Sequence, residues 1–123
     1  MKGNLTIAEI AWLAGIIEGE GWFGFGWAYN LARRHIYSPR IDVQMIDRDV
    51  IEKIANICNV KVYGPYKTAA QPRWVARCNG TKAIGFVFTI YSFLGTRRRL
   101  RLNQIIKYWK SAEAKNCEIR CIK

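Results

Sequence analysis

The chain has 123 residues, half of them hydrophobic, and its 20 lysines and arginines outnumber its 9 acidic residues to give a formal net charge of +11. This length predicts one domain with one core, and the composition argues against a disordered chain. Such a basic excess in a small domain favours a polyanionic partner, nucleic acid above all, over a surface that is merely well solvated. The longest apolar run, residues 10–17, is too short to cross a bilayer, and the first residues lack a signal-peptide pattern. We therefore expect an intracellular protein without membrane contact, in a prokaryotic or phage-infected cytoplasm or in an organelle.

Residues 7–19 are predicted to form a helix that is apolar on almost every side. Thr6 and Glu9 make the capping-box pattern that marks a helix start. Such a helix must be buried on more than one face, and one short domain can cover only one of them. Because the sequence holds no second copy of this helix, we expect a homodimer in which two copies pack together. The expected contact residues, mostly small, are Ala11, Ala14, Gly15, Glu18 and Gly19.

From residue 22 the spacing of the apolar residues changes from helical to alternating, which predicts strands. Residues 22–30 and 40–45 predict a hairpin, and Asp47 is then expected to cap a helix. The same order repeats along the rest of the chain. The predicted class is therefore α+β, a helix–strand–strand–helix–strand–strand–helix plan with an antiparallel sheet and an extra terminal helix, in a single domain over residues 1–123. The later elements are expected at 60–66, 73–79, 81–91 and 96–114, with a loop at 68–72.

Residues 19–24 fit the G-x-G-x-x-G pattern of dinucleotide-binding loops. That fingerprint requires a strand before it and a helix after it, so that phosphates meet the amides of a helix N-terminus. Here a helix ends and a strand begins, and the negative helix end with its two acids would repel a pyrophosphate. The match is therefore rejected as a nucleotide site.

Glu18 and Glu20 lie where this first helix is expected to end. Carboxylates and helix-terminal carbonyls are ligands that suit Mg²⁺. At a dimer axis two copies of Glu20 would come close together, and metal ions held there could serve in-line hydrolysis of a phosphodiester. The alternative is that both acids only cap or solvate the helix end, and their spacing alone does not separate the two interpretations.

The stretch LAGIIEGEG, residues 13–21, resembles the LAGLIDADG motif that names a family of homing endonucleases. The predicted element order is also the αββαββα plan of that family and covers the chain to about residue 110. The resemblance implies a site-specific endonuclease that hydrolyses double-stranded DNA with Mg²⁺, or another divalent cation such as Mn²⁺, at the dimer interface. One motif per chain implies a homodimer on a near-palindromic target. The positions in register are Leu13, Ala14, Gly15, Ile17 and Gly21, with Glu18 and Glu20 at the two acidic positions.

The roles of family residues carry over to matching positions. The last motif acid of the family binds the catalytic metal, which implies this role for Glu20, although many members have aspartate there. The earlier acid, Glu18, would be mainly structural. A polar residue at the end of the second strand organises metal-bound water in the family, which implies Asp47. A basic residue before the terminal helix supports the scissile phosphate, which implies Arg97, with Arg98 as the next choice.

The family lays its strands in the major groove, where base edges carry a distinct donor and acceptor code. The strand faces opposite the apolar ones are therefore implied to contact bases, with Arg bonding guanine and Gln bonding adenine in bidentate fashion. The glycines among them are expected to permit close approach of the DNA rather than to supply specificity. For each candidate the alternative is an ordinary solvated strand face. The candidates are Gly24, Gly26, Asn30, Ser38, Arg40, Asp42, Gln44, Lys61, Arg73 and Arg77.

Two other functions remain open. A related domain that has lost cleavage would be a non-cleaving nucleic-acid-binding protein, an RNA maturase or a DNA-binding regulator. A domain that binds nucleic acid by charge alone would not explain why acids cluster at residues 18, 20, 42, 47 and 49 of a basic chain.

The four cysteines include no Cys-x-x-Cys pair, and the chain has a single histidine to assist them. A zinc site needs tighter pairing of its ligands. We therefore expect structural or free thiols, rather than a metal or disulfide role, for Cys58, Cys78, Cys117 and Cys121.

Overall fold

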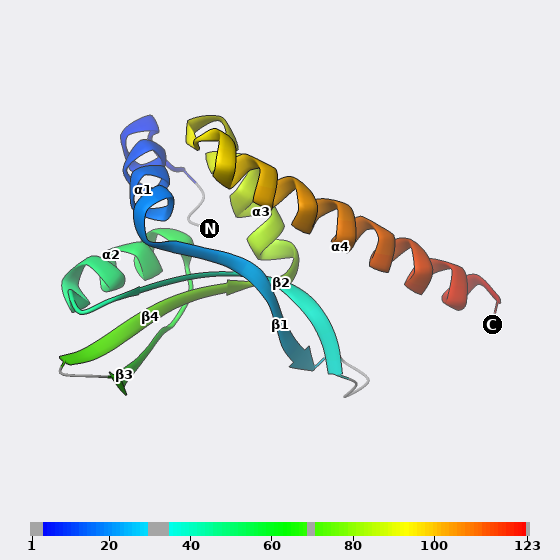
Figure 1. The fold of residues 1–123 in the computed structure, drawn as a ribbon, viewed down its shortest axis with the longest axis horizontal. Coiled ribbons are helices and arrows are strands. Elements are labelled where there is room, and N and C mark those ends of the chain that lie inside the picture. The colour runs from blue at the N-terminus through cyan, green and yellow to red at the C-terminus, as the bar shows by residue number, and fades with distance from the viewer. Residues whose placement is uncertain (1–3, 30–34, 69–70, 123) are drawn as a thin grey trace.

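The computed structural model describes residues 4–29, 35–68 and 71–122 and has an α+β fold in which helices cover one face of an antiparallel sheet (Figure 1). Within these residues the sheet has four strands in the order β1-β2-β4-β3, so that two hairpins lie side by side. This is the α+β plan that the sequence predicts. The elements are α1 (Ile7–Glu20), β1 (Gly21–Tyr29), β2 (His35–Met45), α2 (Arg48–Cys58), β3 (Val62–Thr68), β4 (Gln71–Asn79), α3 (Gly80–Ile90), the 3-10 helix η1 (Tyr91–Phe93) and α4 (Thr96–Ile122).

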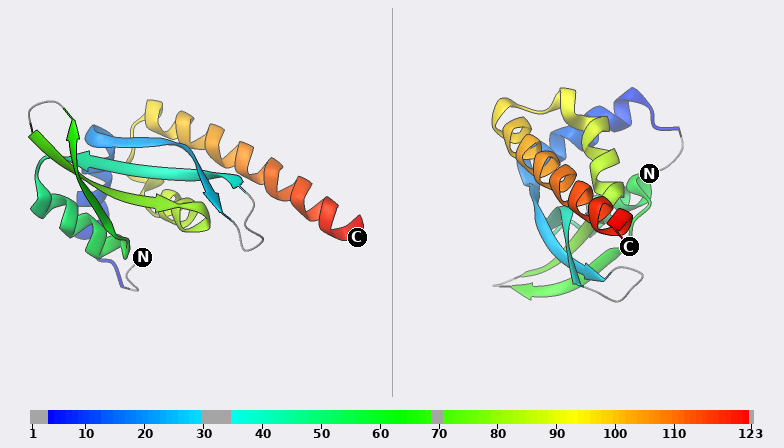
Figure 2. Two further views of the ribbon diagram at one scale, coloured as in Figure 1. Left: turned by 90° about the horizontal axis from the view of Figure 1, so that it is seen from below. Right: turned by 90° about the vertical axis from the view of Figure 1, so that its right-hand side faces the viewer.

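The core lies between the inner face of the sheet and the helices, which gather on one side of it (Figure 2). α2 packs on β4 and α3 packs on β2, while α4 runs past β1. Along β2 the side chains alternate, so that Ile41 and Val43 are buried and Arg40 and Gln44 point to the other face. The sheet therefore presents one face to the core and leaves the other open. The largest fully buried side chains are Leu13, Ile17, Val43, Ile51, Phe86, Val87, Ile90 and Leu102.

α1 begins where the capping box predicts. The Thr6 hydroxyl accepts a hydrogen bond from the Glu9 amide at 3.1 Å, and the Glu9 carboxylate accepts one from the Thr6 amide at 3.2 Å. The helix buries Leu13, Ala14 and Ile17 in the core of its own chain. Ala14 is only 1% exposed, so it packs in this core and not on the exposed side of α1 with the other small residues of the predicted helix contact. That exposed side carries Ala8, Ala11, Gly15 and Gly19.

Two boundaries differ from the sequence expectation for identifiable reasons. β3 begins at Val62 rather than at Val60, because α2 ends in a Schellman motif. Asn59 adopts the left-handed conformation with φ 55°, and the Val60 amide donates to the Ala55 carbonyl at 2.9 Å. α4 continues to Ile122 instead of ending near residue 114, since the chain after Gly95 contains no glycine or proline to stop it. Despite its length, neither α4 nor any other described helix is apolar enough to cross a membrane.

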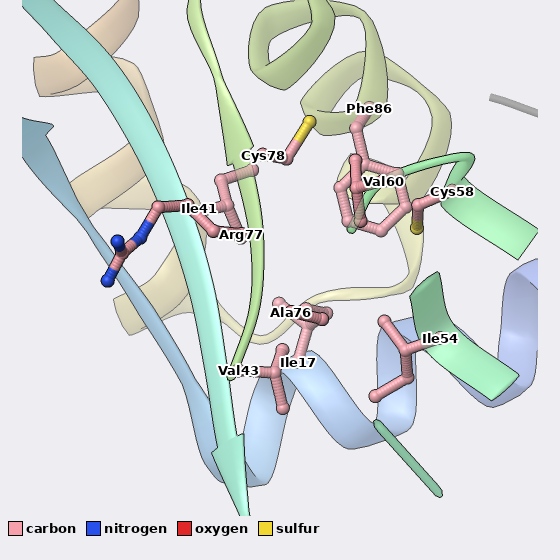
Figure 3. Close-up of a pocket in the computed structure, with 10 residues that line it drawn as sticks. All are labelled: Ile17, Ile41, Val43, Ile54, Cys58, Val60, Ala76, Arg77, Cys78 and Phe86. Carbon is pink, nitrogen blue, oxygen red and sulfur yellow. The ribbon is translucent and has the colours of Figure 1, made fainter. Parts of the chain in front are cut away.

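The core contains a small cavity of about 10 Å³ between α1, α2, β2, β4 and α3 (Figure 3). Its lining is almost entirely apolar and includes the thiols of Cys58 and Cys78, so we expect this small space to stay dry. Burial raises the pKa of Cys58 to about 12 and also raises the pKa of Cys78. Both are free thiols that stay protonated at neutral pH and act as core side chains. The side chains of Cys117 and Cys121 lie outside the described residues.

Candidate nucleic-acid interface

The open face of the sheet unites most of the side chains that the sequence analysis selected. The register pairs Trp22 with Asp42 and Asp42 with Arg77, which forms one row across β1, β2 and β4. In the neighbouring row Arg40 pairs with Asn79. Because cross-strand partners share a face, these rows lie away from the core. The predicted DNA contacts on this face are Gly24, Gly26, Ser38, Arg40, Asp42, Gln44, Arg73 and Arg77.

Gly24 and Gly26 make room for the chain's own side chains. A Cβ atom added at Gly24 would collide with the indole of Trp22, and one added at Gly26 would collide with the guanidinium of Arg40. Arg40 is held there by a hydrogen bond from its Nε to the Asn79 side-chain oxygen at 2.9 Å. The space over both glycines is therefore filled in this structure by the side chains of Trp22 and Arg40, and close approach of DNA at these positions stays a prediction.

Three of the predicted DNA contacts differ from the others in burial, in position or in lying outside the described residues. Ser38 belongs to the open face by its register but is only 7% exposed. Lys61 is exposed just before β3 begins, and Asn30 lies outside the described residues. Conversely, Trp22 was not predicted to lie on the open face, where its side chain is 49% exposed. Trp22 lies two residues before Gly24 and four before Gly26, so alternation along the strand could have placed it on the same face.

A hollow of about 400 Å³ lies on this face beside the junction of α1 and β1. Four of its six lining residues are charged, and one is the exposed indole of Trp22. Its position brings the last acid of α1 together with side chains of β1, β2 and β4. The lining residues are Glu20, Trp22, Arg40, Asp42, Gln44 and Arg73.

The two acids of the motif differ in their surroundings. The Glu18 carboxylate turns to the start of α4 and accepts a hydrogen bond from the Gly95 amide at 3.2 Å. Glu20 is exposed, and no described residue donates a hydrogen bond to its carboxylate. The passage from α1 into β1 requires glycine at position 21, since a Cβ at Gly21 would lie 2.5 Å from the Ile17 carbonyl oxygen. Glu18 therefore joins α1 to α4, whereas Glu20 remains available for a ligand.

Arg98 holds the backbone on both sides of Glu20. Its guanidinium donates to the Glu18 carbonyl from Nε at 3.2 Å and from Nη2 at 3.0 Å, and to the Gly21 carbonyl from Nη1 at 2.8 Å. It also lies over the Phe23 ring at 5.3 Å. A cation at a helix C-terminus is favoured by the helix dipole and satisfies free carbonyls. Arg97, the first choice from the sequence, is exposed and makes no contact of this kind with a described residue.

The fold matches solved structures of homing endonucleases. I-CeuI complexed with DNA has a TM-score of 0.68 at 13% identity over 96% of this chain and 61% of its own. I-CpaMI, a LAGLIDADG meganuclease bound to uncleaved DNA, has a TM-score of 0.66 at 14% identity over 87% of this chain. The chain has the LAGLIDADG homing-endonuclease fold. A third match, I-CvuI with the I-CreI target and 2 mM Mg, has a TM-score of 0.64 at 15% identity over 84% of this chain.

This chain spans 66% of the length of I-CvuI and 37% of that of I-CpaMI. No protein-family model matches the sequence, and no curated protein matches it. At these identities the match to LAGLIDADG structures concerns the fold, and the chemistry must be argued from the side chains of this chain.

The acidic side chains of this chain do not gather at one place, and the described residues contain no cluster of three or more possible metal ligands. Mg²⁺ commonly takes one or two carboxylates and fills its other positions with waters and substrate phosphates. The unpaired Glu20 carboxylate fits that requirement if a second copy and a DNA phosphate complete the site. Asp47 occupies the N-cap position of α2, yet its exposed carboxylate makes no capping hydrogen bond. It therefore also remains available.

We expect Arg98→Ala to loosen the end of α1. The change removes three hydrogen bonds and leaves the Glu18 and Gly21 carbonyls without these donors, so unfolding free energy should fall by about 2–3 kcal/mol. Chemical denaturation measures this loss. Arg97→Ala, one residue away and exposed, is the matched control and should change stability by less than about 0.5 kcal/mol. Equal losses for the two variants would contradict the role given to Arg98.

Proposed function

We propose that this chain is a site-specific, homing-type endonuclease that hydrolyses double-stranded DNA. The observation that carries the proposal is the exposed, unpaired Glu20 carboxylate at the end of α1, beside a hollow lined by arginine, glutamine and indole side chains. In a chain of net charge +11, a carboxylate without an ion-pair partner adds little to the stability of the fold. Such a carboxylate is well suited to bind a divalent metal ion.

The chain is proposed to act as a homodimer through α1. Ala11, Gly15 and Gly19 are exposed on one side of this helix, and apart from the neighbouring backbone of α1 itself no described atom lies within 4 Å of a Cβ added at either glycine. Small residues let two helix backbones approach closely, and a twofold axis there would bring two Glu20 residues together. The two open sheet faces would then extend along the DNA in opposite directions, which supports a near-palindromic target.

The proposed cofactor is Mg²⁺ or another divalent cation such as Mn²⁺. When bound, the ion would supply an activated water and stabilise the leaving oxygen of the phosphodiester. Glu20 would hold the ion, and Asp47, one of the free acids, is proposed to orient water. Arg98 would fix the backbone on both sides of Glu20, and Arg97, exposed at the start of α4, is proposed to contact the DNA phosphates.

Sequence recognition is proposed for the open face. Arg40, Gln44 and Arg73 line the hollow and would contact base edges or phosphates in the major groove. Of the other candidates, Lys61 is exposed and would add a phosphate contact at the edge of the sheet. The two acids of the hollow, Glu20 and Asp42, would keep it from binding every phosphate equally.

The test is to incubate the purified protein and Mg²⁺ with a plasmid pool that carries the DNA flanking its own gene, and to map the ends. We expect double-strand breaks at one defined sequence, lost in EDTA and restored by Mg²⁺ or Mn²⁺. Sequence-specific binding without cuts in any metal or salt condition would point to a non-cleaving DNA-binding regulator. Preferential binding of a structured RNA would point to a maturase instead.

A further inference from the structure

Asp42 and Arg77 form a two-bond ion pair on the open face of the sheet. Arg77 Nε donates to Asp42 Oδ1 at 3.0 Å, and Arg77 Nη2 donates to Asp42 Oδ2 at 3.1 Å. The Arg77 side chain is 27% exposed and the Asp42 side chain 17%, so both are partly covered but still reach solvent. The two residues are direct partners in the β2–β4 ladder. The backbone register therefore fixes the pair, which does not depend on a flexible loop.

This pairing uses one particular edge of the guanidinium. An arginine has five N–H donors in a fixed planar fork. The Nε and Nη2 donors of the side edge bind Asp42, which leaves the end edge, formed by Nη1 and the second hydrogen of Nη2, without a partner among the described residues. Figure 3 shows the guanidinium extending away from Cys78 and Phe86 and across β2, so this edge is not turned into the core.

A third residue restrains the same group. The Tyr63 ring of β3 lies 5.6 Å from the Arg77 guanidinium carbon, at cation–π distance. Arg77 is therefore held by hydrogen bonds along one edge and by a ring against it. The hydrogen bond to Asp42 also raises the pKa of Arg77, which keeps the guanidinium charged in this partly covered position. Arg40 makes one side-chain hydrogen bond, and Arg73 makes none with a described residue.

We propose that Asp42 is a positioning residue that holds Arg77 so that its free end edge bonds a guanine in the major groove. The two parallel N–H groups of that edge match the O6 and N7 acceptors of guanine. The inference rests on the proposed function and deepens it by naming one base and the residue that selects it. Both Asp42 oxygens accept hydrogen bonds from Arg77, and the role proposed for Asp42 is to hold that guanidinium.

The pair also accounts for an acid in the middle of a DNA-binding face. A free arginine would bind any phosphate within reach, and its side chain would lose its freedom on binding. An arginine already fixed by a carboxylate loses less freedom, while the carboxylate repels phosphates that lie close to it. Asp42 therefore lowers the affinity for DNA of any sequence and raises the selectivity for one base.

The test is a selection of bound duplexes from a randomised pool by the full chain in the absence of Mg²⁺. The wild type should enrich an inverted repeat with guanine at one position in each half-site that depends on this pair. Arg77→Lys, which keeps the charge and most of the stem, should lower the preference for guanine there by at least about fivefold. Asp42→Asn should do the same and should also raise affinity for unrelated DNA, a change that a loss of structure would not produce.

A second measurement replaces that guanine with 7-deazaguanine, which lacks only the N7 acceptor. Wild-type affinity should fall by at least about fivefold, while Arg77→Lys should be nearly insensitive. Thermal unfolding of both variants serves as the folding control. A defined site that keeps every preference in both variants, or wild-type binding that ignores 7-deazaguanine, overturns the inference and leaves the proposed function intact. A wild type that enriches no sequence overturns both.

Discussion

Glu20→Gln is expected to abolish DNA cleavage while leaving DNA binding nearly unchanged. Replacing the carboxylate with an amide removes the negative charge that we propose holds the metal, at a cost of about 4 kcal/mol in transition-state stabilisation, or about a thousandfold in rate. Because the Glu20 side chain is exposed and its carboxylate makes no hydrogen bond with a described residue, the change should not disturb the fold. Single-turnover cleavage of the mapped target and DNA binding in Ca²⁺ measure the two effects separately.

The matched control for this prediction is Glu18→Gln, two residues earlier on the same helix. The amide oxygen of glutamine can still accept the hydrogen bond from the Gly95 amide, so the join between α1 and α4 should survive. We expect cleavage within about tenfold of the wild type for this variant. If Glu18→Gln were as inactive as Glu20→Gln, or if Glu20→Gln lost DNA binding, the separate roles of the two acids would be wrong.

Gly15→Leu is expected to give a well-folded chain that neither dimerises nor cleaves. In the single chain a Cβ at Gly15 meets nothing within 4 Å, and replacing a helical glycine stabilises the helix by about 0.5–1 kcal/mol. At a twofold contact between two α1 helices the same leucine would be inserted twice. Overpacking on that scale costs about 2–6 kcal/mol, which weakens association by at least about 30-fold.

Gly85→Leu on α3 provides the control for this variant. Gly85 is also an exposed helical glycine with nothing within 4 Å of an added Cβ, but it lies outside the proposed contact. Light scattering should give twice the chain mass for the wild type and Gly85→Leu, and a single chain mass for Gly15→Leu. A Gly15→Leu chain that remains a dimer and still cuts DNA would show that α1 is not the interface.

The order of helices and strands could be predicted because each element has its own period of apolar residues. The capping box at Thr6 and the change of period after Gly21 are local signals, and the structure places the boundaries of α1 and β1 close to them. The start of β3 could not be predicted in the same way, because it depends on the left-handed conformation of Asn59. The extension of α4 had a signal in the sequence, since no glycine or proline follows Gly95 to stop the helix.

The site was harder to predict because its contacts join distant parts of the chain. Alternation along β2 and β4 indicated which residues share a face, but it could not indicate that Asp42 and Arg77 are partners, since these strands are not consecutive. The choice between Arg97 and Arg98 depended on the angular position at which α4 meets α1. A single residue changes that angle by about 100° along a helix. Only Arg98 reaches the carbonyls beside Glu20 among the described contacts.

The proposed function requires two copies of the α1 end to act together on one DNA duplex. The most direct measurement is to sequence both broken strands of the target after cleavage in Mg²⁺. We predict two cuts at fixed positions, one in each strand and related by the twofold axis of the near-palindromic site, with neither cut made by Glu20→Gln. Cuts scattered along the DNA, a cut confined to one strand, or cuts that persist in EDTA would contradict it.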